Sequence, residues 1–256
     1  SGKLELNGAS DDTQNIFIQN NCANNGVVWS GITNHGGGIC VESQGGGVTC
    51  KNCLFKGNKA SMRGGAINTI TGTNSFKNCT MSSNSGVYYG GAFASIDKDG
   101  LALAINTFEN CSFTNNSSID YGGGLTLDAG TCNFTNCTIS GNSTGQKGGG
   151  VYSTSATATF EKCSIINNKS SGYGGGISFL RTSTANLKVS DTQITGNTVS
   201  SSSSGAGIYI ETYNNQTAGK ITVTGATKIK GNKYSSSESN IYFKYGETMD
   251  VTGLAT

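Results

Sequence analysis

The residues best able to do chemistry are nine cysteines, and five of them recur at a regular spacing. Successive members of this set stand 26, 32, 26 and 26 positions apart. Regularly spaced thiols suit metal binding, redox chemistry or packing as small buried hydrophobes. Cys50 and Cys53 form a single CxxC, but both also fit core positions of a repeat. We therefore expect buried free thiols, rather than disulfides or a metal site, at Cys53, Cys79, Cys111, Cys137 and Cys163.

The acidic side chains are dispersed, whereas enzymes that act on polysaccharides need clustered carboxylates. Asp97 and Asp99 form one Asp-x-Asp without a third acidic neighbour in the sequence, which favours a solvated loop, with calcium binding at these two residues as the alternative. The sequence contains no zinc-protease or phosphate-loop motif. We expect no catalysis and no cofactor, with a carbohydrate-active enzyme as an alternative.

One position of the repeat gathers aromatic and cationic side chains. If coils stack about 4.8 Å apart, these side chains form a column in which cations lie against tyrosine rings. Such a column suits contact with sugar rings or with a protein. The alternative is that stacking only stabilises a turn. We predict a contact surface at Arg63, Tyr89, Tyr121, Lys147 and Tyr173, with His35 before the first and Ser204 after the last.

The elements that would position these residues follow from the repeat around each cysteine. An asparagine lies five positions after each cysteine of the set, and an apolar residue preceded by small residues lies nine positions further on. Thr192 and Thr227 replace the cysteine in two later copies. In a stack of coils, the asparagines form a column that passes amide hydrogen bonds from coil to coil. We expect this column at Asn58, Asn84, Asn116, Asn142 and Asn168, continued by Asn197 and Asn232.

The repeat length and the composition favour one fold class. Apolar residues alternate over short stretches and glycines interrupt each copy, which argues against helices. The 39 glycines and the absence of proline suit many tight turns between short strands. A repeat near 26 residues without a helical segment is typical of a parallel β-helix. We predict an all-β, right-handed, single-stranded parallel β-helix of about eight coils, in which residues 1–256 form one domain.

The charge and hydropathy of the chain argue against several partners. Lys and Arg number 17 against 15 acidic residues, and a net charge of +2 gives no general attraction to nucleic acid or anionic membranes. The sequence has no run of 18 apolar residues, so no segment is expected to insert into a membrane. We expect neither nucleic acid nor membrane among the partners.

Two recurring motifs resemble those of a known family. GGAI at Gly64–Ile67 and FxxN at Phe17–Asn20, Phe55–Asn58 and Phe113–Asn116 resemble the paired motifs of chlamydial polymorphic membrane protein repeats. The resemblance implies a β-helical segment that is displayed at a cell surface and used in adhesion. We accordingly expect a secreted or cell-surface protein that binds a host or neighbouring cell-surface protein or glycan.

Insertions and glycosylation motifs mark the predicted outer surface. Extra residues between the glycine strand and the next cysteine predict projecting loops over 96–106 and 211–220. Another insertion carries Trp29, the only tryptophan, which we expect to cap the first coils. Outward-facing Asn-x-Ser/Thr sites would be glycosylated in a eukaryotic secretory pathway. The candidates are Asn78, Asn110, Asn136 and Asn215.

The start and the end of the sequence share one phase of the coil. Lys3–Ser10 resembles Lys220–Thr227, and residues 249–256 form a similar stretch. The sequence predicts no cover for either end coil, and an uncovered end offers unpaired backbone groups to another chain. Head-to-tail stacking into a filament is therefore an alternative function. The end residues expected to make this contact are Leu4, Leu6, Met249 and Val251.

Overall fold

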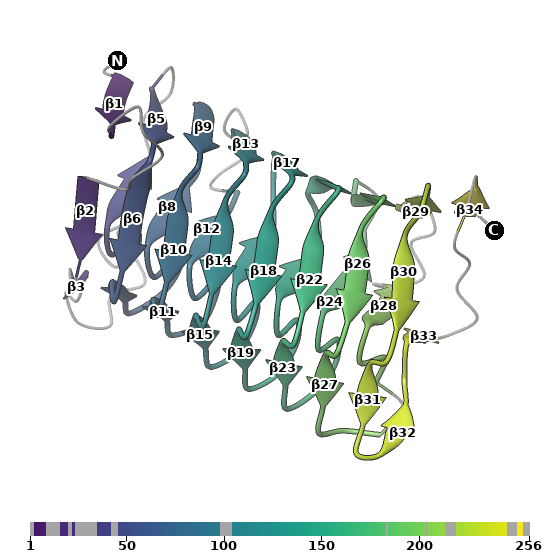
Figure 1. The fold of residues 1–256 in the computed structure, drawn as a ribbon. Helices are drawn as coiled ribbons and strands as arrows, with labels where there is room; N and C mark the ends of the chain where they lie inside the picture. Colours follow the sequence, from purple (N-terminus) through teal and green to yellow (C-terminus); the bar gives the residue numbers. More distant parts are fainter. Residues whose placement is uncertain are drawn as a thin grey trace.

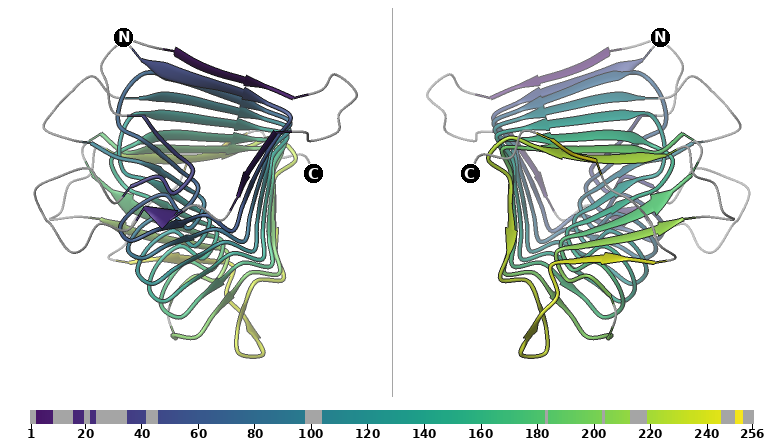
Figure 2. Two further views of the ribbon diagram at one scale, coloured as in Figure 1. Left: turned by 90° about the vertical axis from the view of Figure 1, so that its left-hand side faces the viewer. Right: turned by 90° about the vertical axis from the view of Figure 1, so that its right-hand side faces the viewer.

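The chain folds into a solenoid of parallel strands in the computed structural model (Figure 1). The structure describes residues 3–8, 16–19, 22–23, 35–41, 46–97, 104–182, 184–202, 204–212, 219–244 and 250–252. Four sheets run along the rod, with eight or nine strands in each, and they enclose a narrow core (Figure 2). The solenoid is right-handed and all-β, so the predicted fold class is confirmed.

The four sheets, numbered here I to IV, collect every fourth strand of the chain up to β31, after which β32, β33 and β34 join sheets III, IV and I. Sheet I contains β1 (Lys3–Asn7), β5 (Gly47–Lys51), β9 (Thr73–Lys77), β13 (Ile105–Glu109), β17 (Thr131–Thr135), β21 (Thr157–Glu161), β25 (Asn186–Ser190), β29 (Lys220–Thr224) and β34 (Asp250–Thr252). Sheet II contains β2 (Ile16–Gln19), β6 (Cys53–Lys56), β10 (Thr80–Ser82), β14 (Ser112–Thr114), β18 (Thr138–Ser140), β22 (Ser164–Ile166), β26 (Gln193–Thr195) and β30 (Lys228–Lys230).

The other two sheets complete each coil. Sheet III contains β3 (Cys22–Ala23), β7 (Lys59–Ala60), β11 (Ser85–Gly86), β15 (Ser117–Ser118), β19 (Ser143–Thr144), β23 (Lys169–Ser170), β27 (Thr198–Val199), β31 (Lys233–Tyr234) and β32 (Ser237–Glu238). Sheet IV contains β4 (Ile39–Val41), β8 (Ile67–Thr69), β12 (Phe93–Ser95), β16 (Leu125–Leu127), β20 (Val151–Ser153), β24 (Ile177–Arg181), β28 (Ile208–Thr212) and β33 (Ile241–Phe243).

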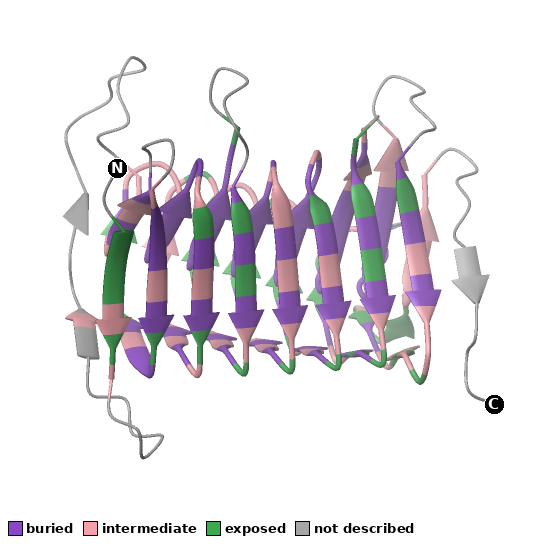
Figure 3. Ribbon diagram, turned by 90° about the horizontal axis from the view of Figure 1, so that it is seen from above, coloured by how far each residue is buried: buried purple, intermediate pink, exposed green. Residues whose placement is uncertain are grey.

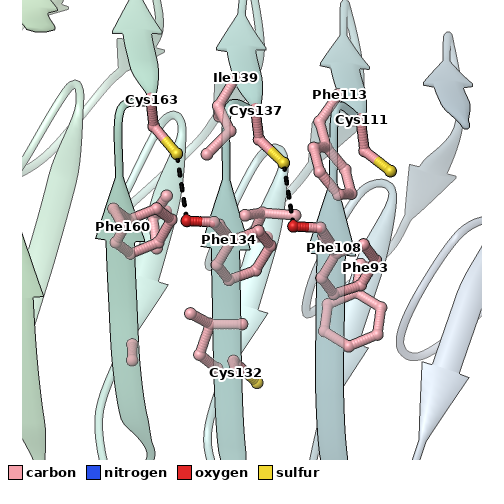
Figure 4. Close-up of a cluster of buried hydrophobic side chains, with 14 of the residues drawn as sticks. Phe93, Phe108, Cys111, Phe113, Cys132, Phe134, Cys137, Ile139, Phe160 and Cys163 are labelled. Atoms are coloured by element: carbon pink, nitrogen blue, oxygen red, sulfur yellow. Dashed lines mark hydrogen bonds between the residues drawn. The ribbon is translucent and has the colours of Figure 1, made fainter. Parts of the chain in front are cut away.

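The register places like side chains above one another in the core. Phe108 pairs with Phe76 on one side and Phe134 on the other. The ring centroids of these neighbours lie 4.7 and 4.8 Å apart, which is the spacing of hydrogen-bonded strands. Residues along sheet I alternate between buried and more exposed positions (Figure 3). Figure 4 shows the buried phenylalanine rings close to one another in the core. The core is therefore one continuous stack rather than a single globular cluster.

The predicted asparagine column is confirmed as a ladder of buried amides. Asn116 donates hydrogen bonds from its backbone N and from Nδ2 to Oδ1 of Asn142, both at 2.9 Å. Its Nδ2 also donates to the backbone oxygen of Met81 at 3.0 Å. The same bonding repeats from coil to coil at Asn58, Asn84, Asn116, Asn142, Asn168 and Asn197. Each amide thus joins its coil to the preceding coil through a backbone oxygen and to the next coil through the following asparagine.

The cysteine column consists of buried thiols, as predicted. Cys53, Cys79, Cys111, Cys137 and Cys163 are all buried and form no disulfide. Cys137 donates to the backbone oxygens of Phe108 at 3.5 Å and Thr135 at 3.4 Å (Figure 4). In a later coil, Thr192 Oγ1 makes the equivalent bonds to the oxygens of Phe160 and Ser190. The position therefore requires a small side chain that donates one hydrogen bond to the backbone.

The paired glycines between sheets III and IV are fixed by close backbone contacts. Gly148 has a φ of +74°, a conformation that disfavours residues with a Cβ. A Cβ on Gly149 would lie 2.4 Å from the backbone oxygen of Gly175 in the next coil. This tight corner brings the residue just before the glycines, Lys147 in this coil, onto the outer surface beside sheet IV.

The first coil departs from the predicted register. Ile18, and not Phe17, pairs with Phe55, so the assignment of an FxxN motif to Phe17–Asn20 is wrong. Because side chains alternate along a strand, a shift of one residue decides which side chain enters the core. Ile18 packs against the core cluster in the position that phenylalanine occupies in the next coil.

The predicted insertions are shorter than expected, because their ends belong to strands. Ile96 and Asn106 are buried, and β13 already begins at Ile105. Glu211 lies within β28, and Lys220 begins β29. The middles of both insertions, as well as Trp29, lie outside the described residues.

The two ends of the solenoid belong to one sheet. β1 and β34 are the outer strands of sheet I, which confirms that the start and the end of the sequence share one phase. Leu4 is 45% exposed, whereas Leu6 packs against the core. Val251 pairs with Val223, and Met249 lies outside the described residues. Head-to-tail association through these strands stays a prediction.

One edge at the far end of the solenoid is covered, contrary to expectation. β32 folds back and pairs antiparallel with β31, so it occupies the outer edge of sheet III. The reversal uses Ser235, whose φ is +53°. Asn240 Oδ1 accepts from Asn232 Nδ2 at 3.0 Å and thereby ends the asparagine ladder. A short hairpin of polar residues carries no hydrophobic pattern, and for this reason the sequence analysis missed it.

We predict that Asn142→Ala lowers the stability of the solenoid by at least about 2 kcal/mol, because it leaves the backbone N–H and one side-chain N–H of Asn116 buried without an acceptor. The matched control is Asn133→Ala on the outer side of β17, which is expected to change stability by less than about 0.5 kcal/mol. Urea unfolding followed by circular dichroism measures both. Equal effects of the two variants would show that the ladder contributes nothing beyond an ordinary surface amide.

We also predict that Cys111→Thr is tolerated, with a loss of less than about 1.5 kcal/mol, because threonine fills the same position at Thr192. Cys111→Asp buries a charge without a partner and is expected to lower the stability by about 3 kcal/mol or more.

Burial and hydrogen bonding of the thiols also predict that a thiol reagent labels them slowly in the native protein and rapidly after denaturation. Rapid labelling of Cys79, Cys111 and Cys137 in the native state is incompatible with this packing.

Candidate functional site

The predicted contact residues form one column beside sheet IV. Consecutive members pair through isolated parallel bridges, so the structure brings together all five predicted residues. Tyr89 and Tyr121 stack with ring centroids 5.3 Å apart. The guanidinium of Arg63 lies 4.8 Å from the ring centre of Tyr89. We call this set, Arg63, Tyr89, Tyr121, Lys147 and Tyr173, the contact column.

Three further tyrosines lie beside the contact column and were missed by the sequence analysis. They are the second residues of β20, β28 and β33, and point outward because side chains alternate along a strand. Tyr152 packs against Tyr121 with centroids 4.8 Å apart, and Tyr209 packs against Tyr173 at the same distance. Tyr242 stacks on Tyr209 at 5.8 Å. We call the contact column together with Tyr152, Tyr209 and Tyr242 the tyrosine face.

The tyrosine face is layered. Tyr152 and Tyr209 are 8% and 2% exposed, whereas the tyrosines of the contact column are only half-buried. The rings of Tyr152 and Tyr209 therefore form a buried floor, against which Tyr121 and Tyr173 of the contact column pack. Burial is the main cause that raises the pKa of Tyr152 and of Tyr209, so both phenols stay protonated.

One end of the tyrosine face is held by a triplet of charges. Lys147 and Lys244 each donate from Nζ to a different carboxylate oxygen of Glu211, both at 2.7 Å. Burial acts to raise the pKa of Glu211, but the hydrogen bonds and charges of the two lysines outweigh it and lower the pKa. Nζ of Lys147 also lies 5.7 Å from the ring centre of Tyr173. Sequence reasoning placed Lys147 in the column but had no signal for its partner 64 positions away.

The other end carries a carboxyl group, that of Asp128, which makes no ion pair with any residue that the structure describes. Burial raises the pKa of Asp128; the charge of Arg63 opposes this shift, and that of Asp97 adds to it. Among the described residues, none donates a hydrogen bond or forms an ion pair with the Asp128 carboxyl. The charge of Asp128 in turn helps to raise the pKa of Tyr152, which places the two groups within electrostatic range. Asp128 is thus a carboxyl group at the edge of the tyrosine floor.

The two ends are related by a shift of three coils along sheet IV. Residues of the first end recur three strands later with similar chemistry. The shift amounts to about 14 Å at the spacing of parallel strands. The corresponding pairs are Arg63 and Lys147, Tyr89 and Tyr173, Tyr152 and Tyr242, and Asp128 and Glu211. We call the two copies the Asp128 centre and the Glu211 centre.

The calcium candidates lie near the Asp128 centre. Asp97 is exposed at the start of an insertion, and its charge reaches Asp128. Asp99 lies outside the described residues. In the part of the chain that the structure describes, no three His, Cys, Asp or Glu side chains gather as metal ligands. Calcium binding at Asp97 and Asp99 stays a prediction.

The glycosylation candidates lie at the corner between sheets I and II, away from the tyrosine face. Asn78, Asn110 and Asn136 share a φ of 53°. Asn110 donates from Nδ2 to Asn78 at 3.3 Å, and Asn78 donates to Asn52 at 3.1 Å, so they form a second, outer amide column. Asn110 and Asn136 are exposed and Asn78 is half-buried, while Asn215 lies outside the described residues. Glycosylation stays a prediction.

Comparison with known families agrees with this architecture. The family described as "Right handed beta helix region" matches residues 60–227, a segment that includes the contact column and both carboxylates of the tyrosine face. No curated protein and no solved structure shows a significant match. Over the described residues there is no helix of the length and apolarity needed to cross a membrane.

Replacing Asp128 and replacing Glu211 by the corresponding amides is expected to change the stability of the fold in opposite directions. The native state raises the pKa of Asp128 above its usual 3.8, so its charged form destabilises the fold at neutral pH. Asp128→Asn is expected to raise the melting temperature at pH 7 by a few degrees, and this gain should disappear as the pH falls below about 3.8. Differential scanning calorimetry across this pH range measures the effect.

Glu211→Gln is the matched variant with the reverse sign. The native state lowers the pKa of Glu211, so its contribution is present above its usual value of 4.5 and is lost as the pH falls through the native pKa. The variant should cost about 1–3 kcal/mol at pH 7, because it removes a hydrogen-bonded charge from two lysines. A stability loss from both variants at pH 7 would contradict the proposed difference between the two centres.

Proposed function

The chain belongs to the right-handed β-helix family, and from this premise we propose that it is an extracellular or cell-surface contact module that binds a glycan through the tyrosine face. The observation that carries the proposal is the pair of tyrosine stacks on one rigid sheet, each with a cation over its first ring. Aromatic rings held in place by packing offer contact area at a small entropic cost. The proposed role is adhesion to a neighbouring or host surface.

The layering of the face supports binding rather than turn stabilisation alone. A column that served only to stabilise the turn would have no use for a floor of additional tyrosines. Here Tyr152 and Tyr209 hold the overlying rings at fixed positions. The overlying rings of Tyr89, Tyr121 and Tyr173 keep part of their surface open to solvent. A sugar chain that ran along the rod would meet these rings in succession.

The insertions also favour this face as the contact surface. β12 and β28 belong to sheet IV, and an insertion follows each of these strands. Insertions in a solenoid tend to lie on the binding face. The sequon asparagines lie at a different corner, so glycosylation there would leave the tyrosine face open.

The separation of Asp128 and Glu211 argues against these two carboxylates acting as a catalytic pair. Enzymes that hydrolyse glycosidic bonds place two carboxyl groups roughly 5–9.5 Å apart. Asp128 and Glu211 lie three coils apart, a shift of about 14 Å along the rod. Two lysines also neutralise Glu211, which leaves it a poor base. The arrangement suits ligand contact better than paired acid and base catalysis.

We predict that joint replacement of Tyr89, Tyr121 and Tyr173 by serine weakens binding to the glycans of a target cell surface by about tenfold or more. The melting temperature should also fall by a few degrees, because Tyr121 and Tyr173 pack on the floor tyrosines. The matched control is Tyr88→Ser, since Tyr88 adjoins the column but is 41% exposed outside it. A glycan array and calorimetry together measure both quantities.

Glycan binding and melting temperature, taken together, distinguish a binding role of the contact column from a role in stabilising the turn. Weaker binding in the triple variant with unchanged binding in Tyr88→Ser supports the proposed function. A drop in stability with unaltered glycan binding would mean that the contact column only stabilises the turn. Binding that is lost equally in Tyr88→Ser would place the contact elsewhere.

A further inference from the structure

The two centres on the tyrosine face differ in one respect that points to a ligand. In the Glu211 centre, the carboxylate is neutralised from both sides by Lys147 and Lys244. In the Asp128 centre, the position of Lys147 is taken by Arg63, which lies over a tyrosine ring and forms no ion pair with Asp128. The Asp128 centre is therefore a copy of the Glu211 centre that lacks part of its positive charge.

The position that corresponds to Lys244 can be identified from the backbone. Lys244 follows β33 and donates from its N to the backbone oxygen of Ile210 at 2.9 Å. Thr154 follows β20 and donates in the same way to the oxygen of Leu127 at 3.0 Å. Leu127 directly precedes Asp128, as Ile210 precedes Glu211. Thr154 thus stands where an ammonium group stands in the other centre.

We infer that the ligand supplies this missing group, and that the Asp128 centre binds the primary ammonium of an amino sugar within the glycan. The inference rests on the proposed function and names the ligand class for that surface. Lys244 serves as the internal model, since its ammonium binds Glu211 beside Tyr209 and Tyr242. In the Asp128 centre the rings are those of Tyr89, Tyr121 and Tyr152.

The surroundings of Asp128 fit an ammonium group. Tyrosine faces attract cations, and a carboxylate with few other partners gives a strong charge-assisted hydrogen bond. A bound ammonium would also relieve the cost of holding Asp128 charged in a partly buried place, as two lysines do for Glu211. Without a ligand, the charged form of Asp128 therefore lowers the stability of the fold, as is common for residues at binding sites.

Arg63 favours an amino sugar over the side chain of a lysine in a protein. Its charge reaches Asp128, and a guanidinium is an array of hydrogen-bond donors with no acceptor. The group therefore favours a ligand that carries acceptor oxygens close to its ammonium. An amino sugar carries hydroxyl and ring oxygens next to its amine, whereas the end of a lysine side chain carries none. The same centre can therefore satisfy Asp128 and Arg63 with one sugar unit.

The test compares two glycans that differ only at the amine. Isothermal titration calorimetry measures binding of a β-1,4-linked glucosamine hexamer and of the fully N-acetylated hexamer to the whole chain. We expect the free amine to bind at least about tenfold more tightly, since a hydrogen bond to a charged group is at stake. Asp128→Asn should remove this preference while it raises the melting temperature, so lost binding cannot be attributed to unfolding.

A second variant fills the centre from within. Thr154→Lys places an ammonium where Lys244 stands in the other copy, and we expect it to abolish the preference for the free amine and to raise the melting temperature. The control is Thr135→Lys, which adds the same charge on sheet I, away from sheet IV. This control should leave the preference unchanged.

Each alternative outcome has a distinct meaning. If both hexamers bind equally to the wild-type chain and to Asp128→Asn, the amine inference is overturned while the proposed glycan contact stands. If neither hexamer binds and the tyrosine variants leave target-glycan binding unaltered, the proposed function fails with it. If a lysine peptide binds more tightly than the glucosamine hexamer and competes with it, the centre serves a protein partner and the amino-sugar assignment is wrong.

Discussion

Coil-to-coil stacking at a single strand spacing is the constraint on which the rest of the structure depends. Every side chain in a coil has its counterpart one spacing above and below, so each position must suit a column rather than a single site. The asparagine ladder satisfies this demand most completely, because each amide bonds to the coil before it and to the coil after it. The stacked phenylalanines and thiols fill the space that the ladder and the glycine corners leave.

The same constraint explains how a uniform rod acquires a local site. Positions inside the coil hardly vary, since a change there would disturb two neighbours. Positions on the outer side of sheet IV are free to differ, and there tyrosines alternate with cations and carboxylates. Recurrence after three coils gives two centres of related chemistry, of which one is neutralised by its own lysines. The other, at Asp128, retains a carboxylate for an external partner.

The residue columns that repeat with a nearly constant period could be predicted from the sequence. The residues whose roles depend on contacts between coils could not. Cys53 to Cys163, the ladder asparagines and the contact column were readable because spacing alone defines them. The register at Phe17 was wrong, since one coil offers too few positions to exclude a shift of one residue. Glu211 and Asp128 gave no sequence signal, because their neighbours lie in other coils and only the stacking brings them together.

The central claim is that a ligand lies along the tyrosine face of sheet IV, and hydrogen–deuterium exchange with a bound glycan tests it most directly. With saturating glucosamine hexamer, the account predicts added protection in β16, β20 and the turns that carry Tyr89 and Tyr121. It predicts no change in β14 and β18 of sheet II, on a different side of the same coils. Protection confined to sheet I or sheet II, with sheet IV unaffected, would contradict the account.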